Sequence, residues 1–303
     1  MADQRSEPPA FSRDSQVLRL PSRLSLEDIS PEWAWGGATG AGMRVAVVDS
    51  GIDAEHPALG GCVDVDQGVF IRETADGTED LIGPHGDSFG HGTACAGIIH
   101  TLAPRARITS IKVLGAGLTG KAVVFLRGLA WAIEQQFDVI NLSLGTSRRD
   151  WALPFYELCD EAYFRNCFVV TAANNVTRPS FPSMYAAVAS VACNLATDPL
   201  RFHYNPDPPT EFLARGIDVE LPWLDGGWSV GTGNSYAAPH IAGIATLIRS
   251  KHPELRPFQL KTVLSATAAN AREAPEIAGR LSRVTRALTA SSRASTALRR
   301  PLS

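Results

Sequence analysis

Three short segments of the chain each place a chemically reactive side chain among small residues. Asp49 ends the apolar run of VAVVDSGID (45–53), His91 follows a glycine in GHGTACAGI (90–98), and Ser235 lies in GTGNSYAAPHIAG (231–243). A serine hydroxyl is a poor nucleophile at neutral pH unless a base takes its proton, and a third group must orient that base. Asp, His and Ser in this chain order form one of the three known arrangements of such a triad. Together the segments indicate nucleophilic catalysis.

Each segment also has an ordinary structural interpretation. An Asp-Ser-Gly sequence such as that at Asp49 is common in turns, a single histidine such as His91 is usually a core or surface residue, and Ser235 is a common type of helix N-cap. A serine that opens a helix would also lie where free N–H groups favour negative charge. The Ser235 segment is not the Gly-x-Ser-x-Gly elbow of α/β-hydrolases, because Ala237 stands in place of the second glycine.

The combination resembles the subtilisin-like serine peptidases, the subtilase family. DSGID, GHGTACAG and GNSYAAPHIAG match the family's Asp, His and Ser signatures in order, and the resemblance covers about residues 25–268. It implies that Ser235 is the nucleophile, that His91 is the general base and acid, and that Asp49 holds the imidazole tautomer. The expected activity is hydrolysis of peptide bonds through an acyl-enzyme on Ser235. We expect a serine endopeptidase that processes either one specific precursor peptide or proteins in general.

Two further segments take their roles from the resemblance. FVVTAANN (168–175) is similar to the family's Ala-Ala-Gly-Asn segment, whose Asn donates to the oxyanion. Aligning the alanine pair places that donor at Asn175, with Asn174 in place of the usual glycine; a pair of turn residues is the ordinary alternative. Ser143, Leu144 and Gly145 resemble the edge segment that pairs with the substrate backbone, although a plain buried strand would also fit.

The sequence departs from the family at its strong calcium site. Ala58 stands nine residues after Asp49, where the family has an Asp, and residues 98–107 leave almost no loop to supply carbonyl ligands. Hard cations need oxygen ligands, so we expect no metal there. We expect no cofactor either.

Other departures lie close to the predicted site. The segment 175–181 looks shortened, which would open one wall of the family's S1 pocket; Arg178 in it either selects an acidic side chain or points to solvent. Cys95, one helical turn after His91, matches the family's thiol-dependent subgroup, and a buried inert thiol is the alternative. Asn174, Ala94 and Tyr236 are unusual for the family, which leaves a catalytically silent peptide-binding pseudopeptidase as the alternative function.

Short apolar runs alternate with helical patterns along the chain. The runs at 44–50, 106–114, 138–145, 167–174 and 188–193 are nearly continuous, which is typical of strands buried on both faces. Helices are expected at about 90–100, 120–136, 151–165, 236–250 and 257–268, the second with Val123, Leu126, Ala130 and Ile133 on one face. This alternation predicts an α/β fold, a single domain with a mostly parallel twisted sheet and helices on both faces.

The boundaries and the location follow from composition. Residues 1–22 are expected to be an extended lead-in, 23–270 the peptidase domain, and 271–303 a basic tail that is either solvated and flexible or binds an anionic partner. An odd number of cysteines, five, without CxxC spacing, and a polar amino terminus predict a cytoplasmic protein. The family's inhibitory pro-domain is not expected, because only about two dozen residues precede the match.

The overall composition limits the partners. Hydrophobic residues make up 45% of the 303 residues and charged residues 19%, an ordinary globular mixture. A formal net charge of −3 gives no reason to expect nucleic-acid binding, and no apolar run reaches the ~18 residues that a membrane span needs. The expected partner is a protein or peptide substrate, and the oligomeric state is not indicated.

Overall fold

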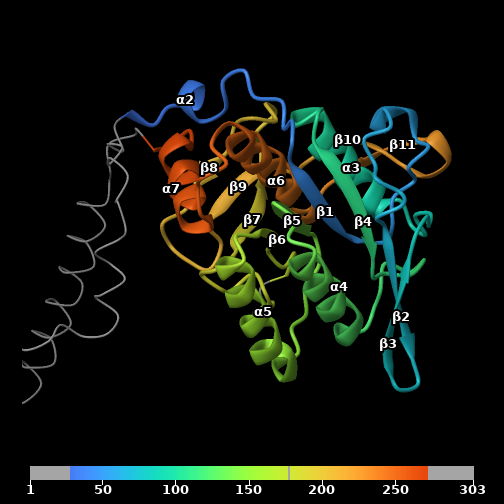
Figure 1. The fold of residues 1–303 in the computed structure, drawn as a ribbon. Helices are drawn as coiled ribbons and strands as arrows, with labels where there is room; N and C mark the ends of the chain where they lie inside the picture. The colour runs from blue at the N-terminus through green and yellow to red at the C-terminus, as the bar shows by residue number, and fades with distance from the viewer. Residues whose placement is uncertain (1–27, 177, 272–303) are drawn as a thin grey trace, which may run out of the picture.

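A nine-stranded sheet in the order β3-β2-β4-β1-β5-β6-β7-β9-β8 forms the centre of the protein (Figure 1). The structure is a computed structural model that describes residues 28–176 and 178–271, so the predicted lead-in and nearly all of the predicted tail lie outside the described residues. The strands of the sheet are β1 (Arg44–Asp49), β2 (Val69–Thr74), β3 (Gly77–Ile82), β4 (Arg107–Lys112), β5 (Val139–Leu142), β6 (Phe168–Ala172), β7 (Ala189–Asn194), β8 (His203–Tyr204) and β9 (Phe212–Arg215).

All neighbouring strands of this sheet are parallel except at its two edges, where β3 pairs with β2 and β8 pairs with β9 in antiparallel fashion. Strand β1 lies between β4 and β5, so the chain crosses from one side of β1 to the other after β4. In open α/β sheets, ligands bind at the carboxyl ends of the strands beside such a change of direction. The predicted mostly parallel sheet is confirmed, and it places the end of β1 at this point.

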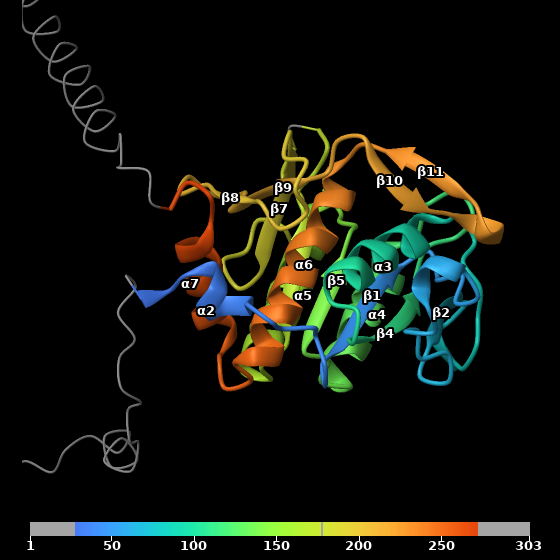
Figure 2. The ribbon, with the colours of Figure 1, turned by 90° about the horizontal axis from the view of Figure 1, so that it is seen from above.

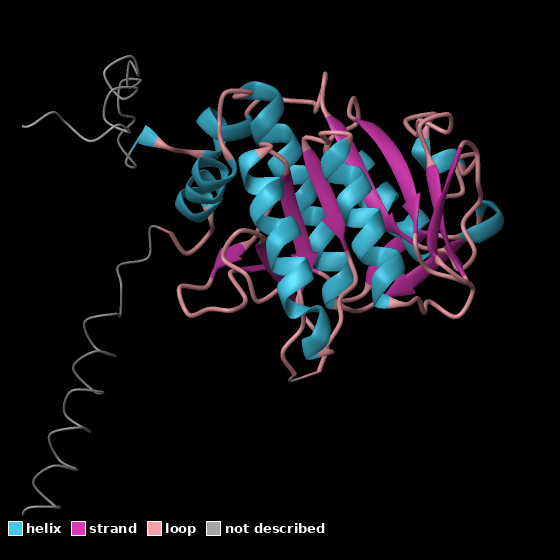
Figure 3. Cartoon of the chain, turned by 60° about the horizontal axis from the view of Figure 1, so that its bottom comes forward, coloured by secondary structure: helices cyan, strands magenta, loops and turns pink. Residues whose placement is uncertain are grey.

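Helices cover both faces of the sheet. The helices are α2 (Pro31–Trp35), α3 (His91–Leu102), α4 (Ala122–Glu134), α5 (Ala152–Phe164), α6 (Asn234–Lys251) and α7 (Pro257–Thr267). Figures 2 and 3 show α3 and α6 side by side on one face, with α4 and α5 on the other. An antiparallel ribbon of β10 (Val219–Pro222) and β11 (Trp228–Gly231) leads directly into α6. The five strands and five helices expected from the sequence are confirmed.

The alternation of side chains along β1 explains why both faces are covered. Val45 and Val47 belong to the apolar core beneath α3 and α6, whereas Ala46 and Val48 belong to the core beneath α4 and α5. Successive side chains of a strand point to opposite faces, so an apolar residue at every position needs helices on both sides. Within the described part of the chain, no helix is both long and apolar enough to span a membrane.

The buried face of α4 differs from the expected one. Of the four residues predicted to share it, only Ile133 is buried, and Val123, Leu126 and Ala130 are half-buried. The residues that α4 buries are Val124, Phe125, Gly128, Leu129, Trp131, Ala132 and Ile133. Gly128 explains the rotation, because a side-chain carbon there would lie 2.5 Å from Val113 Cγ1 and the glycine lets the helix approach the sheet closely.

Candidate active site

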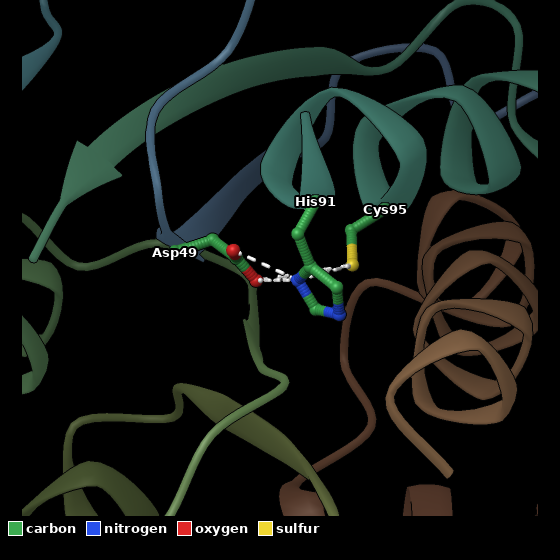
Figure 4. Close-up of side chains that lie close together, drawn as sticks. All are labelled: Asp49, His91 and Cys95. Atoms are coloured by element: carbon green, nitrogen blue, oxygen red, sulfur yellow. Dashed lines mark hydrogen bonds and ion pairs between the residues drawn. The ribbon is translucent and has the colours of Figure 1, made fainter. Parts of the chain in front are cut away.

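Asp49 and His91 form a buried polar pair at the carboxyl edge of the sheet. Asp49 is the last residue of β1 and His91 the first of α3. Nδ1 of His91 lies 2.8 Å from Oδ1 and 2.9 Å from Oδ2 of Asp49, and the two residues are 4% and 0% exposed (Figure 4). With Nδ1–H donating to the carboxylate, Nε2 of His91 remains as the acceptor that a general base needs.

The start of α3 is fixed by groups outside the helix. Its N-cap residue, Gly90, has φ +106° and offers no side-chain cap. Asp87 replaces the cap: its Oδ1 accepts from the N–H of Gly90 at 2.9 Å, and its Oδ2 accepts from the N–H and Oγ1 of Thr93 at 2.9 and 2.7 Å. Ser50 Oγ accepts from the N–H of Gly92 at 3.1 Å. These bonds satisfy helix-end donors and hold His91 against the end of β1.

Ser235 is the second residue of α6 and is half-buried. Its carbonyl oxygen accepts from Ser143 Oγ at 3.0 Å, and the next residue, Tyr236, has its ring centroid 5.2 Å from that of His91. Cys95 Sγ lies 3.9 Å from His91 Nδ1 and 3.6 Å from the Ser235 carbonyl oxygen. Ser235 therefore lies next to the Asp49–His91 pair.

The described residues contain no hydrogen bond between the Ser235 hydroxyl and the His91 ring. Catalytic hydrogen bonds of this kind often tighten only when substrate binds.

Asn175 follows β6 and faces the same space as the Ser235 hydroxyl. A side-chain carbon built on Gly233 would lie 3.4 Å from Ser235 Oγ and 3.9 Å from Asn175 Nδ2. Asn175 Oδ1 accepts from the N–H of Asn234 at 3.0 Å, which orients the amide. The Nδ2 group of Asn175 and the N–H of Ser235 have no hydrogen bond to any described residue, so both are available as donors toward the hydroxyl.

Asn234 is a residue that the sequence analysis did not single out. It is 8% exposed, its Oδ1 accepts from the N–H of Cys193, and its Nδ2 donates to the carbonyl oxygens of Ala173 and Asn174. These bonds tie the start of α6 to the ends of β6 and β7. Its position directly before Ser235 is the one signal in the sequence that could have drawn attention to it.

The predicted substrate-binding segment lies at the open side of the site. Ser143 is buried, with its Oγ accepting from Asn141 Nδ2 at 3.0 Å, whereas Leu144 is half-buried and Gly145 exposed. Within the described ranges, the N–H and carbonyl of Gly145 have no backbone hydrogen bond. A cavity of about 310 Å³ is lined by His91, by this segment and by apolar side chains that include Leu118. Among the described residues, the backbone of Gly145 is therefore left unpaired at the edge of the cavity beside His91.

The electrostatics of the site depend on burial and on the Asp49 carboxylate. Burial alone would lower the pKa of His91, but the Asp49 carboxylate outweighs burial and raises this pKa above its ordinary value. Burial raises the pKa of the Cys95 thiol, despite the opposing effect of His91. Cys95 is therefore a neutral thiol at neutral pH, and His91 is a stronger base than an isolated imidazole.

Asp49, His91 and Cys95 form the one group of potential metal ligands among the described residues, with ligand atoms within 4.8 Å of one another. Soft-metal coordination needs a thiolate, and burial opposes its formation at Cys95. His91 Nδ1 is already bonded to Asp49. The group is better suited to moving a proton than to holding a metal ion.

A buried acid, a histidine and a serine at the carboxyl edge of a parallel sheet, with amide donors beside the serine, have the components of a serine hydrolase. The family model described as the subtilase family matches residues 40–284. The chain is 32% identical over 248 residues to Subtilisin from Bacillus pumilus, covering 77% of this chain and 86% of that protein. It is 30% identical over 247 residues to Subtilisin E from Bacillus subtilis (strain 168), covering 77% of this chain and 62% of that protein.

The chain thus spans less than two thirds of the length of Subtilisin E, but most of the Bacillus pumilus protein. A solved structure, the crystal structure of a cold adapted subtilisin-like serine proteinase, has the same fold with a TM-score of 0.64 at 23% identity, covering 78% of this chain and 87% of that one. The fold of the protein is therefore subtilisin-like. The chain belongs to the subtilase family.

Proposed function

We propose that this chain hydrolyses peptide bonds of a protein or peptide substrate through an acyl-enzyme on Ser235. The observation that carries the proposal is the buried contact of both Asp49 oxygens with His91 Nδ1, at 2.8 and 2.9 Å, directly beside the first turn of α6. This contact leaves His91 Nε2 as the acceptor for the proton of Ser235.

In the first half of the reaction, Ser235 Oγ attacks the carbonyl carbon of the peptide bond and its proton passes to His91 Nε2. The carbonyl oxygen becomes an oxyanion that accepts hydrogen bonds from Asn175 Nδ2 and the Ser235 N–H. The intermediate collapses as His91 gives its proton to the leaving amine, and the acyl group stays on Ser235. The two available donors beside the hydroxyl support this assignment.

In the second half, a water molecule gives a proton to His91 Nε2 and attacks the acyl carbon. The intermediate collapses and frees Ser235 Oγ, which takes the proton back. Asp49 stabilises the imidazolium in both halves and holds the productive tautomer. The effect of the Asp49 carboxylate on the pKa of His91 supports its role in stabilising the imidazolium that forms when His91 takes the proton.

Substrate binding is assigned to Ser143, Leu144 and Gly145, with the substrate backbone pairing with this segment as an added strand. The unpaired backbone groups of Gly145 support this role. Backbone pairing binds many sequences, so it is compatible both with general proteolysis and with processing of one precursor peptide. Cleavage of a peptide library separates the two: broad cleavage would refute the specific-precursor hypothesis. The cytoplasmic location stays a prediction.

The test is a comparison of wild type, Ser235→Ala and Ser250→Ala. Ser250 lies at the other end of the same helix and serves as the matched control. We expect a fluorophosphonate probe to label wild type and Ser250→Ala but not Ser235→Ala, with peptidase activity following the same pattern. A Ser235→Ala protein that cleaves peptides as fast as wild type would refute the mechanism. Peptide binding without labelling of the wild type would instead favour the pseudopeptidase alternative.

A further inference from the structure

A cavity of about 350 Å³ opens behind the predicted oxyanion residue. Its lining includes three serine side chains, one arginine, one methionine and the residue before Asn175: Ser180, Ser183, Ser190, Arg178, Met184 and Asn174. We refer to it as the serine-lined cavity. The proposed mechanism and the predicted triad do not use any of these side chains.

The serine-lined cavity lies between the oxyanion donor and the substrate-binding segment. On one side, the carbonyl oxygen of Asn174 accepts from Asn234 Nδ2 at 3.2 Å, directly before Ser235. On the other side, Ser180 Oγ lies 2.5 Å from where a side-chain carbon of Gly145 would be. A substrate held at both places has the carbonyl of its reacting residue near Asn175. The side chain of that residue, attached one bond from the carbonyl carbon, then enters the cavity.

Ser190 gives the cavity an unsatisfied polar group. Its side chain is 1% exposed, and its Oγ has no hydrogen-bond partner among the described residues although it lines the cavity. A buried hydroxyl without a partner costs free energy, which a ligand that accepts from it would recover. The site is therefore prepared for a side chain that carries an acceptor.

Arg178 gives the cavity its charge. It is exposed, it is the one charged residue in the lining, and it makes no ion pair with a described residue. Glu211, which directly follows the lining residue Thr210, is paired with Lys261 at 2.6 Å. The lining as a whole thus favours a negative charge.

We propose that the serine-lined cavity selects an acidic side chain, glutamate or aspartate, on the residue that precedes the cleaved bond. Ser190 Oγ donates to the carboxylate inside the cavity, and the Arg178 guanidinium pairs with the carboxylate at its mouth. The inference rests on the proposed peptidase activity and names the substrate class of that same site. It chooses between the two roles that the sequence left open for Arg178.

The experiment measures kcat/KM for matched fluorogenic peptides with Glu, Gln or Leu before the cleaved bond. Gln has the shape of Glu without its charge, so the Glu/Gln ratio isolates the carboxylate. We expect wild type to prefer Glu over Gln by about tenfold, because a bond to a charged group is stronger than a neutral one. Arg178→Gln is expected to lower the ratio about fivefold, as for an exposed ion pair, while leaving cleavage of the Gln peptide unchanged.

Three more variants, one of them a control, and one change of conditions sharpen the test. Arg178→Glu is expected to reverse the preference, and Ser190→Ala to lower the Glu/Gln ratio without removing it. Arg105→Gln is the matched control, because Arg105 is also exposed and lies beyond the far end of α3, and it should leave the ratio unchanged. Raising the salt from about 0.05 M to about 0.5 M should lower the wild-type ratio, since exposed charges are screened.

The outcomes separate the two proposals. Fluorophosphonate labelling of Ser235 together with equal cleavage of the Glu and Gln peptides overturns the acidic preference and leaves the peptidase mechanism intact. A ratio that is high in wild type but unchanged in Arg178→Gln and Ser190→Ala also overturns it, because another surface would then read the charge. Absence of labelling and of cleavage overturns the peptidase mechanism and this inference with it.

Discussion

Replacing Asp87 by asparagine tests whether groups outside α3 are what place His91. The Oδ1 atom of Asp87 accepts from Ser50 Oγ at 2.8 Å and from two backbone N–H groups before the helix at 2.9 Å each. Its Oδ2 atom accepts from the N–H and Oγ1 of Thr93 at 2.9 and 2.7 Å. Because α3 has no cap from Gly90, this one carboxylate holds the turn, the helix and the end of β1 together.

The expected magnitude follows from these bonds. An amide has one acceptor oxygen, and its nitrogen can only donate, so Asp87→Asn loses both bonds from Thr93. A hydrogen bond to a charged group contributes roughly 1.5–3 kcal/mol, and two bonds from one residue at a half-buried site are not fully additive. We expect Asp87→Asn to lower the free energy of unfolding by about 3 kcal/mol and Asp87→Ala by about 4 kcal/mol.

The effect has a defined pH dependence. Burial raises the pKa of Asp87, but the hydrogen bonds from Gly90, Thr93 and Phe89 outweigh burial and lower the pKa below its ordinary value. A carboxylate whose pKa is lower in the folded state stabilises the protein above its unfolded pKa of about 3.9, and the stabilisation is lost as the pH falls through the folded pKa. The difference between wild type and Asp87→Asn should therefore be constant near neutral pH and shrink in acid.

Urea unfolding at several pH values measures the stability, and the rate of fluorophosphonate labelling measures the placement of His91. Asp198→Asn is the control, since the side chain of Asp198 accepts a single N–H, from Leu200, in an exposed turn, and it should change the stability by less than about 0.5 kcal/mol. An Asp87→Asn protein with wild-type stability and wild-type labelling would show that α3 holds His91 without this carboxylate.

Three further predictions concern the site itself. Asp49→Asn removes the charge that raises the pKa of His91, so the rise of kcat/KM with pH should move to lower pH. The value of kcat should also fall by roughly 10⁴. An unchanged pH profile would contradict the role of Asp49. Asn175→Ala should lower kcat by roughly 10²–10³, which is the range for one oxyanion donor in a subtilisin, and should leave KM little changed. A rise in KM alone would instead assign Asn175 to ground-state binding. Native Cys95 should resist alkylation by iodoacetamide, because burial raises the pKa of its thiol, and half-buried Cys193 should react first. Mass spectrometry of the labelled peptides measures both reactions. Rapid alkylation of Cys95 would mean that the site opens.

The scaffold was predictable where the sequence carries continuous apolar runs. The run around Val45–Val48 has no polar residue, and only a strand with helices on both faces can bury it. The hairpin of β2 and β3 was not predicted, because β3 has no buried residue and its sequence shows no apolar run. The face of α4 was wrong because apolar residues surround the helix and a small residue, Gly128, decided which side meets the sheet.

The candidate site was predictable where resemblance identified a segment and not where tertiary contacts gave a residue its role. Asp49 and His91 lie 42 positions apart and meet as expected. Asn234 escaped prediction because its partners lie far along the chain, 41 positions away for Cys193 and 61 for Ala173. Asp87 bonds mainly to nearby residues, and only its bond from Ser50, 37 positions away, is of this kind. A polar residue beside a signature does not reveal from sequence alone which helix end or strand end its side chain will satisfy.

The positions of two helix ends explain why the site needs a buried carboxylate. His91 is the first residue of α3, and Tyr236 in the first turn of α6 contacts its ring, so the positive ends of both helix dipoles lie near the imidazole. Their field favours an oxyanion beside Ser235 but opposes a proton on His91. Asp49, fully buried and with both oxygens at His91 Nδ1, offsets that opposition and raises the pKa of the ring. The same edge of the sheet can therefore stabilise the negative charge at Ser235 and the positive charge at His91 that the proposed reaction creates together.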